Sequence, residues 1–237
     1  MRPLTGGLCS ICGERLYSPF AFSGENGDAR CGLCQRMQPL FMKAAAYGSY
    51  EGGLRELIHL LKYDQVRPAA SVLGRMLAEA IEDLQPWFGA GAVLVVPVPL
   101  HPRKLRQRGF NQSKVIAQSA LKILHSGDRL RLDANLLERR RETQSQIGLS
   151  RHQRRENMRG AFAVSRPGAA AGHEILLVDD VFTTGTTASE CARVLRRAGA
   201  LRVFVATVGR TLKADPQQVD WKKDPNLAAG MTMAAAG

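Results

Sequence analysis

The sequence predicts an α/β protein in which helices flank a parallel sheet, preceded by a small N-terminal zinc-ribbon module. Short apolar runs alternate with amphipathic segments along most of the 237 residues, as in parallel sheets. The chain begins with two Cys-x-x-Cys pairs, which favour a metal-stabilised module over a second hydrophobic core. We therefore expect the module at residues 1–40, the α/β domain at 41–212 and a disordered tail at 213–237.

The two cysteine pairs, with eighteen residues between them, have the spacing of a four-sulfur zinc site. We expect a cytoplasmic location, because the chain starts without an apolar signal segment, and reducing conditions there disfavour disulfides. An iron–sulfur cluster also uses four thiolates and stays open as the alternative. The predicted ligands of a structural Zn²⁺ are Cys9, Cys12, Cys31 and Cys34.

Periodicity places the elements of the α/β domain. Amphipathic helices follow residue 53, Pro68, Asn111 and Thr187, and Asn111 is a good helix cap. Residues 139–159 are polar and read as a mobile loop or a weak helix. No apolar run is long enough to span a bilayer, so we expect no membrane insertion. Strands are predicted at residues 44–50, 92–96, 162–164, 175–178 and 201–208.

The most informative segment is ILLVDDVFTTGTT, residues 175–187. An apolar run predicts a strand buried on both faces, two carboxylates stand at its end, and a hydroxyl-rich turn leads into a helix. Ligands of open α/β sheets bind beyond such strand ends, and helix starts attract anions. A phosphate at the turn and a polyhydroxyl group at the acids together indicate a sugar phosphate. The residues are Asp179 and Asp180, then Thr183, Thr184, Gly185, Thr186 and Thr187.

The chain is strongly basic, with a formal net charge of +12. Residues 101–160 hold fifteen Lys and Arg but five Asp and Glu, a local net charge of +10. A patch of this kind attracts polyanions, so pyrophosphate, nucleotides and nucleic acid all remain candidate ligands.

Two segments within this basic region are candidate binding elements. VPVPLHPRKLRQRGFNQS, residues 96–113, offers clustered donors for a pyrophosphate, unless it is an exposed loop without a ligand. Residues 139–162 are predicted to close over a ligand and to form hydrogen bonds with a base, a nucleotide or a nucleic acid. The alternative is that they form a disordered basic linker. The candidates are Arg103, Lys104, Arg106, Arg108 and Asn111 in the first segment, and Thr143, Gln146, Arg155 and Asn157 in the second.

Several motifs, taken in order, resemble the ComF family. They are the four cysteines, GLRELIHLLKYD, VPVPLHPRKLRQRGFNQS, the stretch ending in Gly-Ala-Phe at residue 162, and VDDVFTTGTT. The last motif also resembles the phosphoribosyl pyrophosphate (PRPP) signature of type I phosphoribosyltransferases. That resemblance implies that Asp179 and Asp180 hold the ribose, that residues 183–187 hold the 5′-phosphate, and that Mg²⁺ accompanies PRPP.

The family resemblance implies a zinc ribbon on a type I phosphoribosyltransferase domain. It further implies a role in DNA uptake, in which single-stranded DNA is handled with a competence helicase. Two alternatives stay open at this point. A metabolic enzyme would transfer phosphoribosyl from PRPP to a base or amine and release pyrophosphate, whereas a regulatory protein would bind PRPP without turnover.

Overall fold

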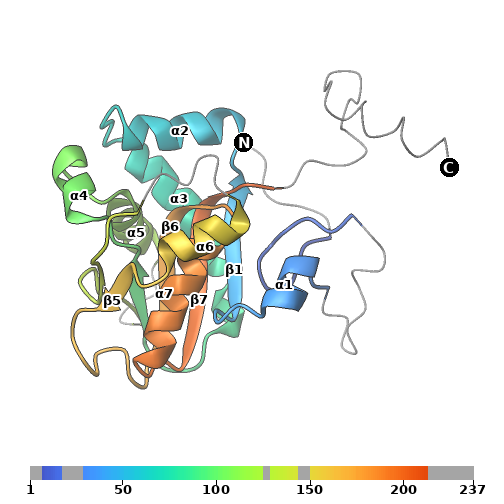
Figure 1. Ribbon diagram of the computed structural model, residues 1–237. Helices are drawn as coiled ribbons and strands as arrows, with labels where there is room; N and C mark the ends of the chain where they lie inside the picture. Colours follow the sequence, from blue (N-terminus) through green and yellow to red (C-terminus); the bar gives the residue numbers. More distant parts are fainter. Residues whose placement is uncertain (1–6, 18–28, 125–128, 144–149, 213–237) are drawn as a thin grey trace.

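Five parallel strands form the central sheet, in the order β1-β7-β6-β2-β3 (Figure 1). The computed structural model describes residues 7–17, 29–124, 129–143 and 150–212. The expected parallel α/β fold is therefore confirmed. The strands of this sheet are β1 (Lys43–Ser49), β2 (Val93–Pro97), β3 (Leu130–Leu132), β6 (Glu174–Phe182) and β7 (Arg202–Arg210).

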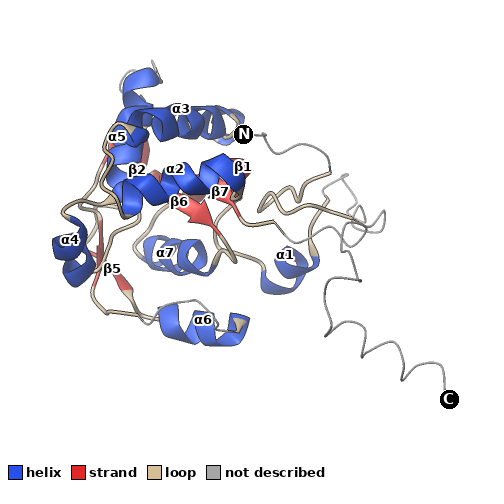
Figure 2. Cartoon of the chain, turned by 90° about the horizontal axis from the view of Figure 1, so that it is seen from above, coloured by secondary structure: helices blue, strands red, loops and turns tan. Residues whose placement is uncertain are grey.

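Helices cover both faces of the sheet and give three layers (Figure 2). The apolar run of β6 serves both layers, because successive side chains of a strand point to opposite faces. One face of the sheet carries α2 (Gly52–Lys62), α3 (Ala69–Glu82) and α5 (Gln112–Ile123). The other face carries α7 (Thr186–Arg197), and α6 (Arg151–Met158) packs on the outer side of α7. Leu176 packs with α2, α3 and α5, whereas Leu177 packs on the opposite side with α7 and the cysteines.

The chain changes direction across the sheet between β2 and β6. From β2 the chain continues outward to β3, whereas from β6 it continues the other way to β7. The two strands are neighbours, with Pro97 opposite Val178, so their carboxyl ends meet. Open α/β sheets bind ligands in the crevice at such a junction. The fold therefore brings the segments after β2 and β6 to one place.

Four of the five predicted strands belong to the central sheet, but the fifth does not. β5 (Phe162–Val164) pairs in an antiparallel manner with β4 (Leu137–Arg139), a strand that the sequence did not reveal. Both are three residues long, too short for a periodic signal. β6 also continues four residues beyond the predicted end at residue 178, so the two aspartates lie inside the strand.

Two helices follow from local signals that are weak in the sequence. Residues 139–159 contain α6, which begins with a capping box between Ser150 and Gln153. The basic segment after β2 forms its own helix, α4 (Pro102–Arg108), with Pro102 in its first turn.

A 3-10 turn, η2 (Gln85–Trp87), follows α3. None of the helices in the described part of the chain is both long and apolar enough to cross a membrane.

The described N-terminal residues pack directly onto the sheet. The backbone N–H of Ala44 in β1 donates to the carbonyl of Ile11, at 2.6 Å. α1 (Gly32–Met37) carries Cys34, and all four N-terminal cysteines share a buried cluster with α7. The cysteine module, as we call residues 7–17 and 29–38, therefore touches the same layer as α6 and α7.

Candidate functional site

The two aspartates at the end of β6 have different partners. Asp180 is buried, and its Oδ2 lies 2.5 Å from Nζ of Lys62, the last residue of α2. Asp179 accepts hydrogen bonds through Oδ1 from the Ser113 hydroxyl at 3.0 Å and from the backbone N–H of Asp180 at 2.9 Å. Lys62 and Ser113 were not among the candidate residues from the sequence, although both lie in motifs that resemble ComF.

The pKa values of Asp179 and Lys62 depend on their burial and on the charge of Asp180. Burial, and secondly the charge of Asp180, raise the pKa of Asp179 to about 7. Burial alone would lower the pKa of Lys62, but the attraction of Asp180 outweighs it and raises that pKa. The site therefore contains one neutralised ion pair and one carboxyl group that changes its charge near neutral pH.

The turn after β6, which we call the threonine loop (residues 183–187), depends on one glycine. Gly185 has φ +74° and precedes the first residue of α7. A Cβ at Gly185 would lie 2.7 Å from Cζ of Phe182, so a larger residue has neither the backbone angle nor the room. Gly185 brings no capping side chain, and the first N–H groups of α7 have no partner within the helix. An anion can accept from these groups.

Asp179 and residues 183 and 185–187 of the threonine loop line one small cleft of about 20 Å³. Val98, just after β2, and Thr207 of β7 also line it. The oxygens of Thr184 and Thr186 lie 2.8 Å apart within the loop. The structure thus brings together the carboxyl group and the hydroxyl-rich turn that the sequence placed on one segment.

The RGFNQS motif joins the ends of β2 and β6. Asn111 caps α5 by accepting from the N–H of Ser113 at 3.0 Å, and its Nδ2 donates to the carbonyl of Val98 at 3.0 Å. The predicted cap is confirmed. Both polar atoms of Asn111 are therefore engaged in positioning Ser113 against Asp179. The assignment of Asn111 to a pyrophosphate stays a prediction.

The predicted basic residues lie together on α4, outside the cleft that holds Asp179. Arg103, Lys104 and Arg106 are exposed, and Arg103 pairs with Glu142 at 3.0 Å. Arg108 donates to Gln112 at 2.6 Å. None of these four side chains lines a described cleft that borders the threonine loop. Their role toward a pyrophosphate therefore stays a prediction.

The candidates between residues 139 and 162 are dispersed. Thr143 is buried and accepts from Arg139, whereas Arg155 is exposed and its Nη1 lies 3.4 Å from Sδ of Met37. Asn157 accepts from Arg141 through its backbone carbonyl. Gln146 lies outside the described residues.

The Gly-Ala-Phe motif serves packing. The N–H of Gly160 donates to Oε1 of Glu190 at 2.7 Å, and Arg193 holds the same carboxylate at 2.6 Å. Burial would raise the pKa of Glu190, but the hydrogen bonds of Arg193 and Gly160 hold it below its usual value. Glu190 thereby anchors the turn before β5 to α7. Sequence reasoning missed Glu190, because its bond to Gly160 joins segments 30 residues apart.

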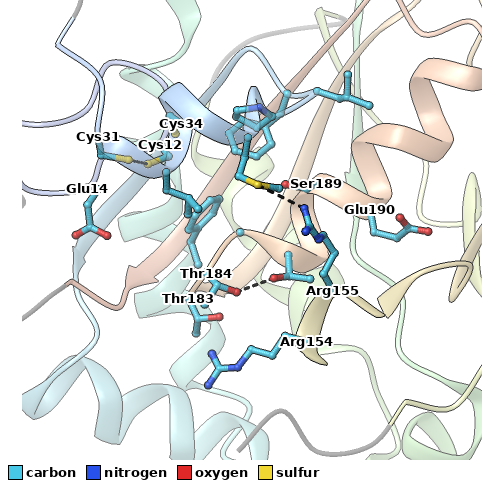
Figure 3. Close-up of a pocket in the computed structure, with 18 of the residues that line it drawn as sticks. Cys12, Glu14, Cys31, Cys34, Arg154, Arg155, Thr183, Thr184, Ser189 and Glu190 are labelled. Carbon is cyan, nitrogen blue, oxygen red and sulfur yellow. Dashed lines mark hydrogen bonds between the residues drawn. The ribbon is translucent and has the colours of Figure 1, made fainter. Parts of the chain in front are cut away.

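A larger cleft of about 590 Å³ lies between the cysteine module, α6, α7 and the threonine loop. Figure 3 shows its two ends, with Cys12, Cys31 and Cys34 at one and Thr183 and Thr184 at the other. Apolar side chains from α1 and from Phe41 and Phe182 form much of the wall.

The four N-terminal cysteines form a site whose geometry fits a metal ion. All four are buried, and their sulfur atoms lie within 4.8 Å of one another. The sulfurs of Cys12 and Cys31 are 3.7 Å apart. A tetrahedral zinc with Zn–S bonds of about 2.3 Å requires sulfurs about 3.8 Å apart. Hydrogen bonds among the four sulfurs lower the pKa of Cys9 and Cys31 and raise the pKa of Cys12 and Cys34.

The similarity to known proteins extends over most of the chain. DNA utilization protein YhgH of Escherichia coli O6:H1 is 33% identical over 215 residues, which cover 87% of this chain and 91% of that protein. Competence protein F of Haemophilus influenzae is 32% identical, over 86% of this chain and 90% of that protein. The chain belongs to the ComF family. The resemblance of its motifs is therefore confirmed.

Other comparisons add less to the ComF assignment. No protein-family model matches the chain. A hypoxanthine phosphoribosyltransferase from Staphylococcus aureus overlaps 63% of this chain and 68% of its own, with 13% identity and a TM-score of 0.38. An overlap this weak supports no conclusion about activity.

Proposed function

We propose that this ComF-family protein binds PRPP, or a related nucleotide phosphate, at the carboxyl end of β6 and serves the handling of single-stranded DNA. One observation carries the first half. Asp179 and the threonine loop line one cleft beside the junction of β2 and β6. This is where an open α/β sheet binds its ligand, and the two chemistries present suit a sugar and a phosphate.

The residues around the cleft would each hold one part of the ligand, most of which would lie outside the cleft, because its volume is only about 20 Å³. The threonine loop would hold the 5′-phosphate through the first N–H groups of α7 and its hydroxyls, and Asp179 would accept from a ribose hydroxyl. Asp180, paired with Lys62, would keep the end of β6 in place. Within the described residues, three or more metal-ligating side chains gather only at the cysteines. Mg²⁺ would therefore be held mainly by the phosphate oxygens of PRPP itself.

The metal at the cysteine cluster is proposed to be a structural zinc. Four thiolates in a closed, buried set are typical of structural rather than catalytic zinc. The module is too small to fold by apolar burial alone, so the free energy of metal binding would stabilise it.

The second half of the proposal rests on charge and on the relatives. The relatives are named for DNA utilization and for competence. α4 exposes Lys104 and Arg106 away from the cleft of Asp179, where a flexible polyanion can reach them, and Arg103 beside them forms an exposed pair with Glu142. A competence helicase is the proposed protein partner. On single strands, binding should weaken with salt at a log–log slope of about −0.7 for each phosphate neutralised.

Calorimetric titration of the zinc-loaded chain with PRPP and Mg²⁺ tests the sugar-phosphate site. Saturable binding should be lost or weakened at least tenfold in Asp179→Asn. The matched control is Glu82→Gln with Asp83→Asn, an exposed acidic pair at the end of α3, which should bind as the wild type does. Equal affinity in wild type and Asp179→Asn, or no saturable binding by folded wild type, would contradict the proposal. Pyrophosphate release with an added base or amine would establish the metabolic alternative.

A further inference from the structure

Arg210, the last residue of β7, is buried between the cysteine module and the threonine loop. It is 3% exposed, and its Nη2 lies 3.4 Å from both the Cys12 sulfur and Oε2 of Glu14. Its Nε and Nη1 are buried and have no hydrogen-bond partner among the described residues. A guanidinium group stays charged in proteins. The buried guanidinium of Arg210, with two N–H donors unsatisfied, therefore requires more negative charge nearby than Glu14 supplies.

A zinc held by four thiolates would supply that charge. Four sulfurs at −1 and one Zn²⁺ leave a net charge of −2 on the cluster, and groups that donate to metal ligands commonly raise metal affinity. The turn that follows Cys12 passes beside Arg210. Gly13 has φ +67°, and a Cβ there would lie 3.7 Å from the carbonyl oxygen of Ala44 and 3.9 Å from Cδ of Arg210.

The opposite side of Arg210 leads to the threonine loop. Its guanidinium carbon lies 4.6 Å from the centre of the Phe182 ring, a cation–π arrangement. That ring in turn lies directly beneath Gly185, at the contact that excludes a Cβ. Cys12, Arg210, Phe182 and Gly185 therefore form an unbroken series of contacts from the metal site to the turn that begins α7.

We propose that Arg210 couples metal occupancy of the cysteine cluster to the conformation of the threonine loop. The charge of the metal–thiolate group holds the guanidinium, the guanidinium holds the Phe182 ring, and the ring supports the left-handed turn at Gly185. Arg210 acts as a positioning residue, since it reaches the loop through Phe182. The coupling does not depend on which phosphate the loop binds.

Zinc-loaded full-length variants test the coupling with two readouts. The rate of zinc release to an excess of chelator reports on the metal, and hydrogen exchange of the amides in residues 183–187 reports on the loop. Arg210→Met should release zinc at least tenfold faster and should exchange the loop amides faster, with Arg210→Lys intermediate. The matched control is Arg202→Met. Arg202 lies on the same strand, pairs with Glu174 and lies 5.7 Å from the Phe204 ring, at the opposite end of β7. Arg202→Met should leave both the rate of zinc release and the exchange of the loop amides unchanged.

Two results would overturn the proposal. Wild-type zinc release in Arg210→Met would show that the arginine does not stabilise the metal. Faster release with unchanged loop exchange would show that the effect ends at the cysteines. If Arg210→Met does not fold, Arg210→Lys gives the same two readouts, and removing zinc from the wild type with a chelator must speed loop exchange. Because PRPP enters neither measurement, failure here is separate from failure of the proposed function.

Discussion

Asp179→Asn should stabilise the folded protein at neutral and alkaline pH, although it removes an acceptor that the proposed ligand needs. In the folded chain, burial and then the neighbouring Asp180 raise the pKa of Asp179 to about 7. In the unfolded chain the carboxyl group ionises near its ordinary value, about 3.9. The folded state therefore holds a proton that the unfolded state has lost, and stability falls as the pH rises from about 4 to 7. Asparagine has no charge to lose, and its Oδ1 still accepts from Ser113 and from the N–H of Asp180.

The size of the effect follows from the two pKa values. One pKa unit corresponds to about 1.4 kcal/mol, so the ionised carboxylate costs on the order of 4 kcal/mol above pH 7. This is an upper value, because Asp179 is partly exposed and water screens its charge. Between pH 5.5 and pH 7 the advantage of the asparagine variant should grow by about 2 kcal/mol and then level off. For a domain of this size that is a gain in Tm of about 4–8 °C.

Thermal melting of wild type and Asp179→Asn between pH 5.5 and 8.5, at constant zinc, measures this growth. The control is Asp83→Asn, which removes an exposed carboxylate and should give a difference in Tm that hardly changes with pH. A constant difference for Asp179→Asn, or a variant that becomes less stable than wild type as the pH rises, would refute the reasoning about burial and repulsion.

Three further substitutions test other contacts. Cys31→Ser should reduce bound zinc and expose the cysteine module to proteolysis; unchanged metal content and Tm would contradict the metal site. Lys62→Met leaves Asp180 buried without its cation and should cost about 3–5 kcal/mol in urea unfolding, part of which Asp180→Asn should restore. Gly185→Ala combines a positive φ with a contact of 2.7 Å to Phe182, so it should destabilise by more than about 1 kcal/mol and weaken PRPP binding in calorimetry. A stable variant that binds normally would show that the loop tolerates a Cβ.

Local signals explain most of what the sequence predicted. The apolar run at residues 175–178 is buried on both faces of a parallel sheet, and the cap at Asn111 begins α5 as expected. Both features depend on neighbours within a few positions, where periodicity and capping preferences apply. The cysteine spacing was similarly informative, because each pair needs only one tight turn to present two sulfurs.

The contacts that complete the site come from distant positions. Lys62 pairs with Asp180 because the end of α2 lies beside the end of β6. Arg210 contacts Cys12 although the two residues are 198 positions apart in the sequence. Neither residue stands out by type, since a lysine at a helix end and an arginine near a strand end are common on surfaces. Their burial is what distinguishes them, and burial follows from topology rather than from the local pattern.

The structure also separates two roles that the sequence had merged. RGFNQS lies in the most basic part of the chain, yet Asn111 and Ser113 bond to Val98 and Asp179, which line the cleft. Arg103 and Arg106 of α4, by contrast, are exposed. A compact sugar phosphate needs the cleft, whereas a long polyanion needs the exposed charges. Asp179→Asn changes the cleft and leaves α4 untouched, so PRPP binding and DNA binding should respond independently to it. If single-stranded DNA affinity falls together with PRPP affinity in this folded variant, the two ligands share one site, and the division between cleft and basic helix is wrong.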